Sequence, residues 1–166
     1  MGDAKVGEAF ITHEFDEAIA IQQAIVDAET TLATKHPQGS AKQAIKASLA
    51  EDKTFLTQLK TLGRAHDATG KVEDVAGGLT ELMEETLSSA TKEGADSDYY
   101  EAHAVLLNLK RKQMDSAGGM LAIARDQKDA KLRTAATEFK KAQKASSEAL
   151  TAELATYAVK IAGASA

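Results

Sequence analysis

Six polar residues interrupt stripes that are otherwise apolar along four helical segments, and some of them could serve a metal ion. They are Glu17, Gln22, Asp52, Lys110, Gln143 and Ser146. Helical bundles that hold two metal ions keep carboxylates and histidines at such a level, facing the bundle interior. Glu17 and Asp52 could ligate iron or manganese, but Lys110 would place a cation beside the metals. The pattern therefore favours a central polar layer in which Lys110 pairs with a carboxylate.

The four histidines give a second route to a metal site. His13 and His103 fall on the apolar stripes, and a metal site could join His13, Glu17 and Glu51 to either Glu101 or His103. A more general candidate set of metal ligands is His13, Glu17, Asp52 and His103. Buried histidines that are satisfied by hydrogen bonds are the simpler interpretation.

The other two histidines lie where helices are expected to end. His36 adjoins a turn and His66 lies near a helix end. We expect both imidazoles at the surface or against a helix C-terminus, where a positive charge suits the helix dipole.

Motifs for other chemistry are absent from the sequence. There is no cysteine, which excludes disulfides, zinc–thiolate sites and thiol catalysis. Neither a Gly-x-Ser-x-Gly motif nor a Gly-rich phosphate loop is present. The net charge of −5 argues against general nucleic-acid binding, which depends on clustered cations. We therefore predict no catalytic residue and no nucleic-acid partner.

The charges are unevenly distributed along the chain. Residues 71–101 contain nine acidic and two basic side chains, whereas residues 110–144 contain ten basic and four acidic ones. Two solvated helix faces would explain this pattern, and complementary patches for self-association would explain it as well.

Apolar residues spaced three and four apart predict five helices, at about 8–35, 40–69, 72–92, 98–125 and 130–161. Pro37 and Gly39 end the first. Ser40 and Gln43 form a capping box for the second. The last two are separated although residues 125–129 contain no Gly or Pro, because one helix from 98 to 162 would be about 97 Å long. Asp126 or Asp129 could cap the last helix.

The lengths of these segments predict the topology of one domain spanning residues 1–166. Short turns make the first two helices antiparallel, and likewise the last two. The segment of about 27 residues between the two pairs contains its own helix and can run the length of the bundle. The fold class is therefore all-α, a four-helix bundle with an additional short helix in the long crossover between its second and third helices.

Local motifs carry a resemblance to a known superfamily. They are His13-Glu14-Phe15, Leu59-Lys60-Thr61-Leu62-Gly63 and Gly77-Gly78-Leu79. With them the chain resembles the ferritin-like four-helix bundles, above all their small bacterial stress-associated branch. That resemblance implies a di-iron site built from two Glu and two Glu-x-x-His motifs. The chain has no Glu-x-x-His, and Phe55 and Ser146 stand where the histidines would be, so the usual ligands are missing.

These observations predict a non-catalytic, stress-related protein that acts through a protein partner or through self-association, as a homo-oligomer such as a dimer. No cofactor is favoured. The alternative is an iron or manganese protein with an irregular ligand set, and a third possibility is a core that binds an apolar or anionic small molecule. No apolar stretch approaches the ~20 residues that span a bilayer, and no secretory signal is visible. We therefore expect a cytoplasmic location.

Overall fold

The computed structural model describes residues 2–73 and 75–164, and all regular structure in these ranges is helical. This confirms the predicted all-helical class. The elements are α1 (Gly2–Lys35), α2 (Gly39–Gly63), a 3-10 turn η1 (Arg64–His66), α3 (Val75–Glu93), α4 (Asp96–Asp126) and α5 (Ala130–Ala164).

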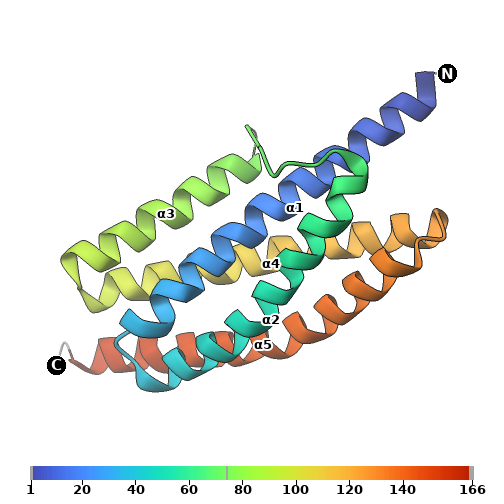
Figure 1. Cartoon of the computed structure of the whole chain (residues 1–166). Coiled ribbons are helices and arrows are strands. Elements are labelled where there is room, and N and C mark those ends of the chain that lie inside the picture. The colour runs from blue at the N-terminus through green and yellow to red at the C-terminus, as the bar shows by residue number, and fades with distance from the viewer. Residues whose placement is uncertain (1, 74, 165–166) are drawn as a thin grey trace.

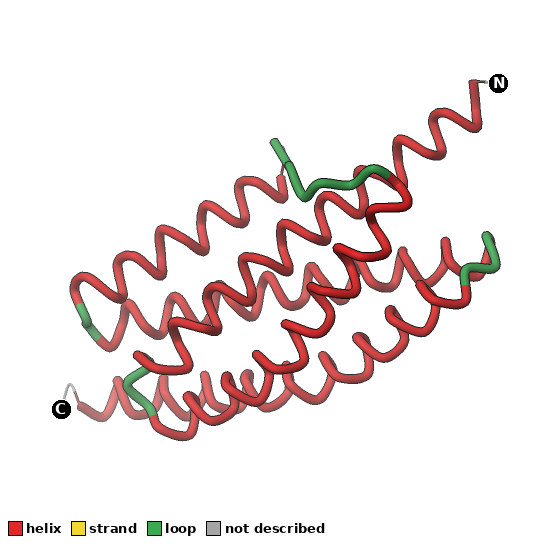
Figure 2. The backbone as a smooth tube through the Cα atoms, in the orientation of Figure 1, coloured by secondary structure: helices red, strands yellow, loops and turns green. Residues whose placement is uncertain are grey.

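Four long helices form a bundle of two antiparallel hairpins, α1 with α2 and α4 with α5 (Figure 1). In this bundle α1 packs on α2 and α4, and α5 packs on the same two helices. The shorter helix α3 lies outside the bundle, against α1 and α4. It connects the first hairpin to the second by returning the chain along the length of the bundle. The loops at the other connections are short, as Figure 2 shows. One long crossover with its own helix therefore joins the second and third helices of the bundle.

Two helix ends lie six residues from their predicted positions, whereas the others agree within three residues. Helix α1 begins at Gly2 rather than near Glu8, because exposed residues 6–10 continue the helix without contributing to the core. Helix α2 ends at Gly63 rather than 69. A Cβ on Gly63 would lie 3.3 Å from the side chains of both Phe15 and Ile19 on α1, so a larger residue would disturb this close approach.

The other helix ends show which capping residues the chain uses. Asp129 Oδ1 accepts a hydrogen bond from the backbone N–H of Leu132 at 3.0 Å, so Asp129 caps α5. Gln38 is the N-cap of α2 and makes no side-chain capping bond. The predicted capping box at Ser40 is wrong, because the Ser40 hydroxyl lies 2.7 Å from Glu153 Oε2 on α5 and donates to it.

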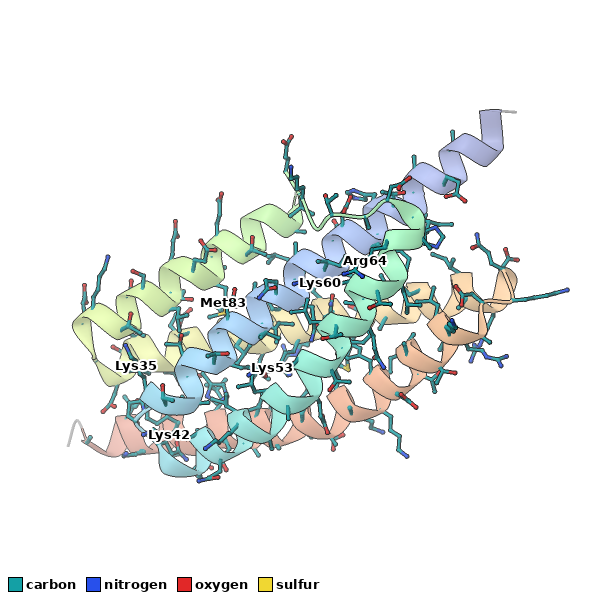
Figure 3. The ribbon with its side chains drawn as sticks, in the orientation of Figure 1. Lys35, Lys42, Lys53, Lys60, Arg64 and Met83 are labelled. Atoms are coloured by element: carbon teal, nitrogen blue, oxygen red, sulfur yellow. The ribbon has the colours of Figure 1, made fainter. Side chains whose placement is uncertain are left out.

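Two apolar clusters fill the bundle interior, one towards each end. One contains Ile25, Leu32, Ile45, Leu106, Leu150 and Tyr157. The other contains Phe15, Phe55, Leu59, Met120, Leu132 and Phe139. Figure 3 shows the side chains along the helices. Along α2, α4 and α5, a short stretch of sequence separates residues of the first cluster from residues of the second, and buried polar side chains occupy it. On α1 the two clusters interleave, because Val26 of the second lies between Ile25 and Ala28 of the first. None of the described helices is long and apolar enough to cross a bilayer.

Candidate functional site

The Lys110 ammonium lies among three oxygen atoms in the middle of the bundle. Lys110 Nζ donates to Asp52 Oδ2 at 2.7 Å, to the Ser48 hydroxyl at 2.7 Å and to Glu29 Oε1 at 3.1 Å. All three hydrogen positions of the ammonium therefore have an acceptor. The side chains of Lys110, Asp52 and Glu29 are 0 % exposed, so α4 places a fully buried cation against carboxyl groups of α1 and α2.

Asp52 connects the ammonium to the other helices of the bundle. Its Oδ1 accepts one hydrogen bond from Gln22 Nε2 on α1 and one from Gln143 Nε2 on α5, each at 2.8 Å. Gln22 Nε2 also lies 3.0 Å from the main-chain oxygen of Asp52. Because its second oxygen faces Lys110, the Asp52 carboxylate contacts side chains from the three other bundle helices.

Two further side chains complete the network. The Ser48 hydroxyl lies 2.8 Å from Glu29 Oε1 and 3.1 Å from Asp52 Oδ2, and its single hydrogen can serve only one of them at a time. Gln113 Nε2, one turn after Lys110, donates to Gln22 Oε1 at 3.0 Å and to the main-chain oxygen of Ala18 at 2.7 Å. We call Gln22, Glu29, Ser48, Asp52, Lys110, Gln113 and Gln143 the buried polar network.

Glu29 has an unusual protonation state in this network. Burial raises the pKa of Glu29 to about 8, the Lys110 ammonium opposes this increase, and the nearby Asp52 charge adds to it. At neutral pH Glu29 is therefore mostly protonated, and the ammonium is balanced by the Asp52 carboxylate alone. Glu29 Oε2 is buried without a hydrogen-bond partner among the described residues, which is costly for a charged oxygen.

The structure brings together four of the six polar residues singled out in the sequence, namely Gln22, Asp52, Lys110 and Gln143. Glu17 lies elsewhere: its carboxylate contacts Lys112 Nζ at 3.2 Å and His13 Nε2 at 3.6 Å. Ser146 is half-buried, and its hydroxyl lies 3.4 Å from the main-chain oxygen of Gln143, outside the buried polar network.

Three members of the network were missed, although the sequence contains a signal for each. Glu29 follows Gln22 by seven residues, Ser48 precedes Asp52 by four and Gln113 follows Lys110 by three. Such spacings place two residues on one face of a helix. A search for further polar residues at these spacings from Gln22, Asp52 and Lys110 would have found all three.

Two histidines form a second buried polar group, near the turn between α1 and α2. His36 and His103 are both 0 % exposed, and His36 Nε2 lies 3.1 Å from His103 Nδ1. The backbone N–H of Gln38 donates to His36 Nδ1 at 3.1 Å, and His103 Nε2 lies 2.9 Å from the main-chain oxygen of Leu150. All four ring nitrogens are thus satisfied when both rings are neutral, with His36 and His103 each protonated at Nε2.

Burial lowers the pKa of both histidines, and that of His36 falls to about 4. The expectation that His36 lies at the surface is therefore wrong: it follows the last residue of α1, but its ring is buried and does not bring a positive charge to that helix end. The expectation that His13 lies on a buried stripe is wrong as well, because its side chain is 49 % exposed. The ring of His36 packs instead against those of Tyr99 and Tyr157.

The candidate metal ligands do not meet in one place. Asp52 belongs to the buried polar network and His103 to the histidine pair, whereas His13 and Glu17 lie together on the early turns of α1. His13, Glu14 and Glu17 are the only three potential ligands that lie within 4.8 Å of one another in the described parts of the chain.

Neither position that the family pattern would give to a histidine holds a ligand. Phe55 stacks on Phe139 with ring centroids 3.7 Å apart, and Ser146 lies outside the buried polar network. The centre of the bundle therefore holds an ammonium–carboxylate pair and amides.

Comparison with protein-family models, with curated proteins and with solved structures gives no match.

Proposed function

We propose that the chain is a non-catalytic ferritin-like bundle protein, in which an internal ammonium takes the place of a metal pair and which works through protein contacts, including self-association. The observation that carries this proposal is the position of Lys110 Nζ, within 3.1 Å of oxygens of Asp52, Ser48 and Glu29 and without exposed surface. The arrangement of two hairpins joined by a helical crossover supports the ferritin-like assignment. The stress-related role is proposed on the resemblance of its short motifs.

The chemistry of the network supports the non-catalytic part of the proposal. A divalent cation next to Lys110 would be repelled by the ammonium at close range in a medium of low dielectric constant. Apart from the carboxyl groups of Asp52 and Glu29, the groups of the network that could bind a metal are amides and a hydroxyl. These are poor substitutes for the histidines of a di-iron site. A hydrogen-bonded polar layer can instead fix how four helices align, because a helix that slips leaves more buried polar groups unpaired.

A second candidate function is favoured by one observation. His13, Glu14 and Glu17 bring three potential ligand atoms within 4.8 Å of one another. On this alternative the chain is an iron or manganese protein with an irregular ligand set. However, Glu17 already pairs with the Lys112 ammonium at 3.2 Å, which places a positive charge beside the candidate ligands, and the His13 side chain is half exposed.

Metal analysis separates the two candidates. The protein should be purified after growth in medium supplemented with iron and manganese, and its bound metal measured by mass spectrometry. We expect far less than one metal ion per chain. One metal ion per chain that is lost in Asp52→Ala, with helicity unchanged, would overturn the proposal. Metal that is lost instead in His13→Ala would establish the alternative at the surface of α1.

A further inference from the structure

The His36–His103 pair connects the turn between α1 and α2 to the other two helices of the bundle. His36 lies in this turn, at the end of the bundle where α5 also ends (Figure 1). Within the turn, the backbone N–H of Gln38 donates to His36 Nδ1. His36 Nε2 contacts His103 Nδ1 on α4, and His103 Nε2 contacts the main-chain oxygen of Leu150 on α5. Three hydrogen bonds in series therefore hold the turn against α4 and α5.

This series of hydrogen bonds has no place for an additional proton. The two ring nitrogens that carry no hydrogen are Nδ1 of His36 and Nδ1 of His103, and each accepts a hydrogen bond. A proton on His36 Nδ1 would point at the N–H of Gln38. A proton on His103 Nδ1 would point at the Nε2–H of His36. In both cases two donors face each other, so one link between the turn and the bundle must break.

The surroundings of the two rings oppose the charge as well. The charged and titratable groups near the rings come from every helix packed there, namely Lys42 on α2, Asp96 and Tyr99 on α4, and Glu153, Tyr157 and Lys160 on α5. The two lysines oppose a proton on His36, whereas the two carboxylates favour one on the pair. Burial outweighs both effects and lowers the pKa of each histidine. Charging the pair therefore requires that the rings reach water.

Acid acts on the centre of the bundle in the opposite direction. His36 follows Glu29 by seven residues and His103 precedes Lys110 by seven, so the pair lies about two turns from the buried polar network. Burial raises the pKa of Glu29 to about 8, so the folded chain holds this proton more tightly than the unfolded chain does. A decrease in pH from 8 towards 4.5 therefore stabilises the centre while it weakens the turn.

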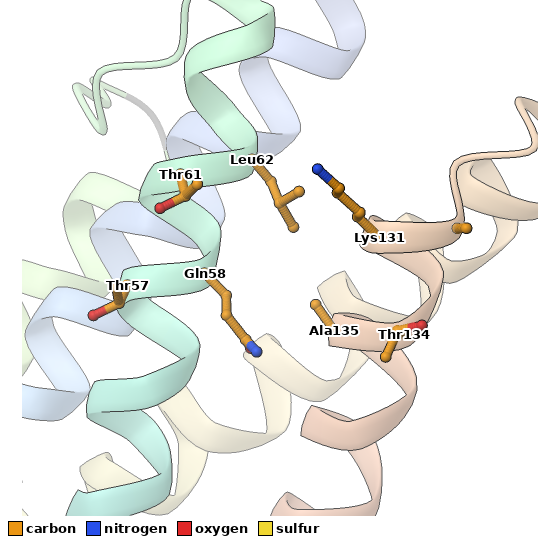
Figure 4. A pocket seen from close by; sticks show the side chains of 8 residues that line it. Thr57, Gln58, Thr61, Leu62, Lys131, Thr134 and Ala135 are labelled. Atoms are coloured by element: carbon orange, nitrogen blue, oxygen red, sulfur yellow. The ribbon is translucent and has the colours of Figure 1, made fainter.

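At the other end of the bundle, the histidines face carboxylates. His13 lies 3.6 Å from an oxygen of Glu17, and His66 lies 3.7 Å from an oxygen of Glu8. An imidazolium at either position gains an opposite charge. The groove of about 500 Å³ between α2 and α5 at that end is lined by threonine, glutamine, leucine, alanine and lysine side chains, Lys131 among them (Figure 4). Acid neutralises none of these groups, so we expect this end to stay closed.

We propose that the His36–His103 pair is an acid-sensitive latch: a proton taken up by the pair releases the α1–α2 turn from α4 and α5 while the rest of the bundle stays folded. The release moves Gln38 and Ser40 away from Glu153 Oε2, to which both side chains donate in the closed state. It also uncovers Tyr157, whose ring packs on His36 and has no exposed surface. The chain thereby presents a different surface in acid than at neutral pH.

Thiol labelling at two positions of the full chain tests the latch, because the chain has no cysteine of its own. Ala41→Cys places a thiol in the first turn of α2, where the side chain is 0 % exposed, and Ala117→Cys places one in the second apolar cluster, where it is 1 % exposed. The ratio of the two labelling rates with a pyridyl disulfide cancels the effect of pH on the thiol itself. This ratio should increase about tenfold for each pH unit below 6.5, as the uptake of one proton requires. Circular dichroism checks that the helices persist over this range.

Two variants in the Ala41→Cys and Ala117→Cys chains identify the group that takes up the proton. His36→Asn with His103→Gln removes both titrating rings, while the amides can still accept from the Gln38 N–H and donate to the Leu150 oxygen. The ratio should then be independent of pH. Glu153→Gln is the matched control, because Glu153 is a carboxylate at the same turn that acid could neutralise, and it should keep the increase.

Three results would overturn the latch. The first is a labelling ratio that stays constant as the pH falls, which would mean that the two ends respond alike. The second is an increase that survives in the double histidine variant, and the third is an increase that disappears in Glu153→Gln. The comparison of the two thiols and the Glu153→Gln control need no histidine variant, so they decide the matter even where the double variant does not fold.

Discussion

Lys110 Nζ lies 2.7 Å from Asp52 Oδ2 at a point where neither side chain has any exposed surface. The pair joins α4 to α2, and through Gln22 and Gln143 the same Asp52 carboxylate is bonded to α1 and α5. Such a pair contributes less to stability than its Coulomb attraction suggests, because both charges lose their hydration. Losing one partner is costly, however, since the other charge then stays buried alone.

Replacing Lys110 with methionine should therefore lower the free energy of unfolding by about 3–5 kcal/mol at neutral pH. The side chain keeps a similar length, so the loss comes mainly from the unpaired Asp52 carboxylate. Urea denaturation followed by circular dichroism measures the change. Lys112→Met is the control, because Lys112 pairs with Glu17 while 35 % of its side chain is exposed, and it should cost less than about 1 kcal/mol.

A double-mutant cycle tests whether the two charges depend on each other. Asp52→Asn combined with Lys110→Met removes both charges, so the double variant should lose clearly less stability than the sum of the two single losses. Additive losses would show that the ammonium and the carboxylate do not interact in solution.

Removing the whole Lys110 side chain should create a response to divalent metal. In Lys110→Ala, oxygens of Asp52, Glu29 and Ser48 that lie within 3.1 Å of Nζ in the wild type lose their cation. Manganese should therefore raise the Tm of this variant by binding only the folded chain, and adding Asp52→Asn should abolish the increase. Wild-type Tm should change with neither manganese nor a chelator. A wild-type Tm that falls in chelator would contradict the ammonium-centred network.

The raised pKa of Glu29 predicts that stability declines as the pH increases. The folded chain retains a proton on Glu29 up to about pH 8, whereas the unfolded chain releases it near the ordinary value of 4.5. The folded state therefore binds more protons in this interval, and the free energy of unfolding should fall by on the order of 2–4 kcal/mol between pH 5 and pH 8.

Glu29→Gln isolates this contribution, because the amide resembles the protonated acid at every pH. Urea denaturation at several pH values should show a smaller decline for Glu29→Gln than for the wild type. Parallel curves for the two proteins would mean that Glu29 is ionised in the fold.

The sequence predicts the helices well because each follows an apolar stripe with the helical period. The break after α4 was predictable from length alone, since one helix through residues 98–162 would exceed a compact domain, and the structure places it at 127–129. The residues at which the helices end were harder to predict. Gly63 ends α2 where its backbone meets Phe15 and Ile19, and that contact between distant residues leaves no local signal.

The buried polar network was only partly predictable, for geometric reasons. Asp52, Lys110 and Gln143 interrupt apolar stripes and meet at one level. Glu17 lies five residues before Gln22, which turns it by about 140° around the helix, so it faces Lys112 instead. The burial of His36 depends on packing with Tyr157, a residue of α5 far away in sequence. Local patterns carry no information about that contact.

The histidine pair predicts a loss of stability in acid. His36 stays neutral in the folded chain down to about pH 4, whereas the unfolded chain binds the proton near pH 6.5. The unfolded state thus binds more protons in this interval, so the free energy of unfolding should decrease as the pH falls from 6.5 towards 4, by on the order of 3 kcal/mol. Glu29 acts in the opposite direction above pH 4.5, so the test is made in the Glu29→Gln background.

His36→Asn in that background should flatten the acid decline, because the titrating ring is gone. His13→Asn changes a half-exposed histidine on α1 and serves as the control, which should retain the decline. An acid decline that is unchanged by His36→Asn would mean that the pair already binds a proton in the folded chain.

The Asp129 cap predicts a cost at the start of α5. Asp129 Oδ1 accepts from the Leu132 N–H at 3.0 Å, and the preceding residue Lys128 adopts a left-handed φ of 58° that turns the chain between α4 and α5. Asp129→Ala leaves that N–H without its side-chain acceptor and removes a negative charge from the helix N-terminus, so it should cost about 1 kcal/mol.

Asp126→Ala changes the last residue of α4, also an aspartate, and should cost less. Lys128→Gly relieves the left-handed strain and should recover part of the loss when combined with Asp129→Ala. Chemical denaturation measures all three variants, and equal costs for Asp126→Ala and Asp129→Ala would show that the capping bond contributes no stability of its own.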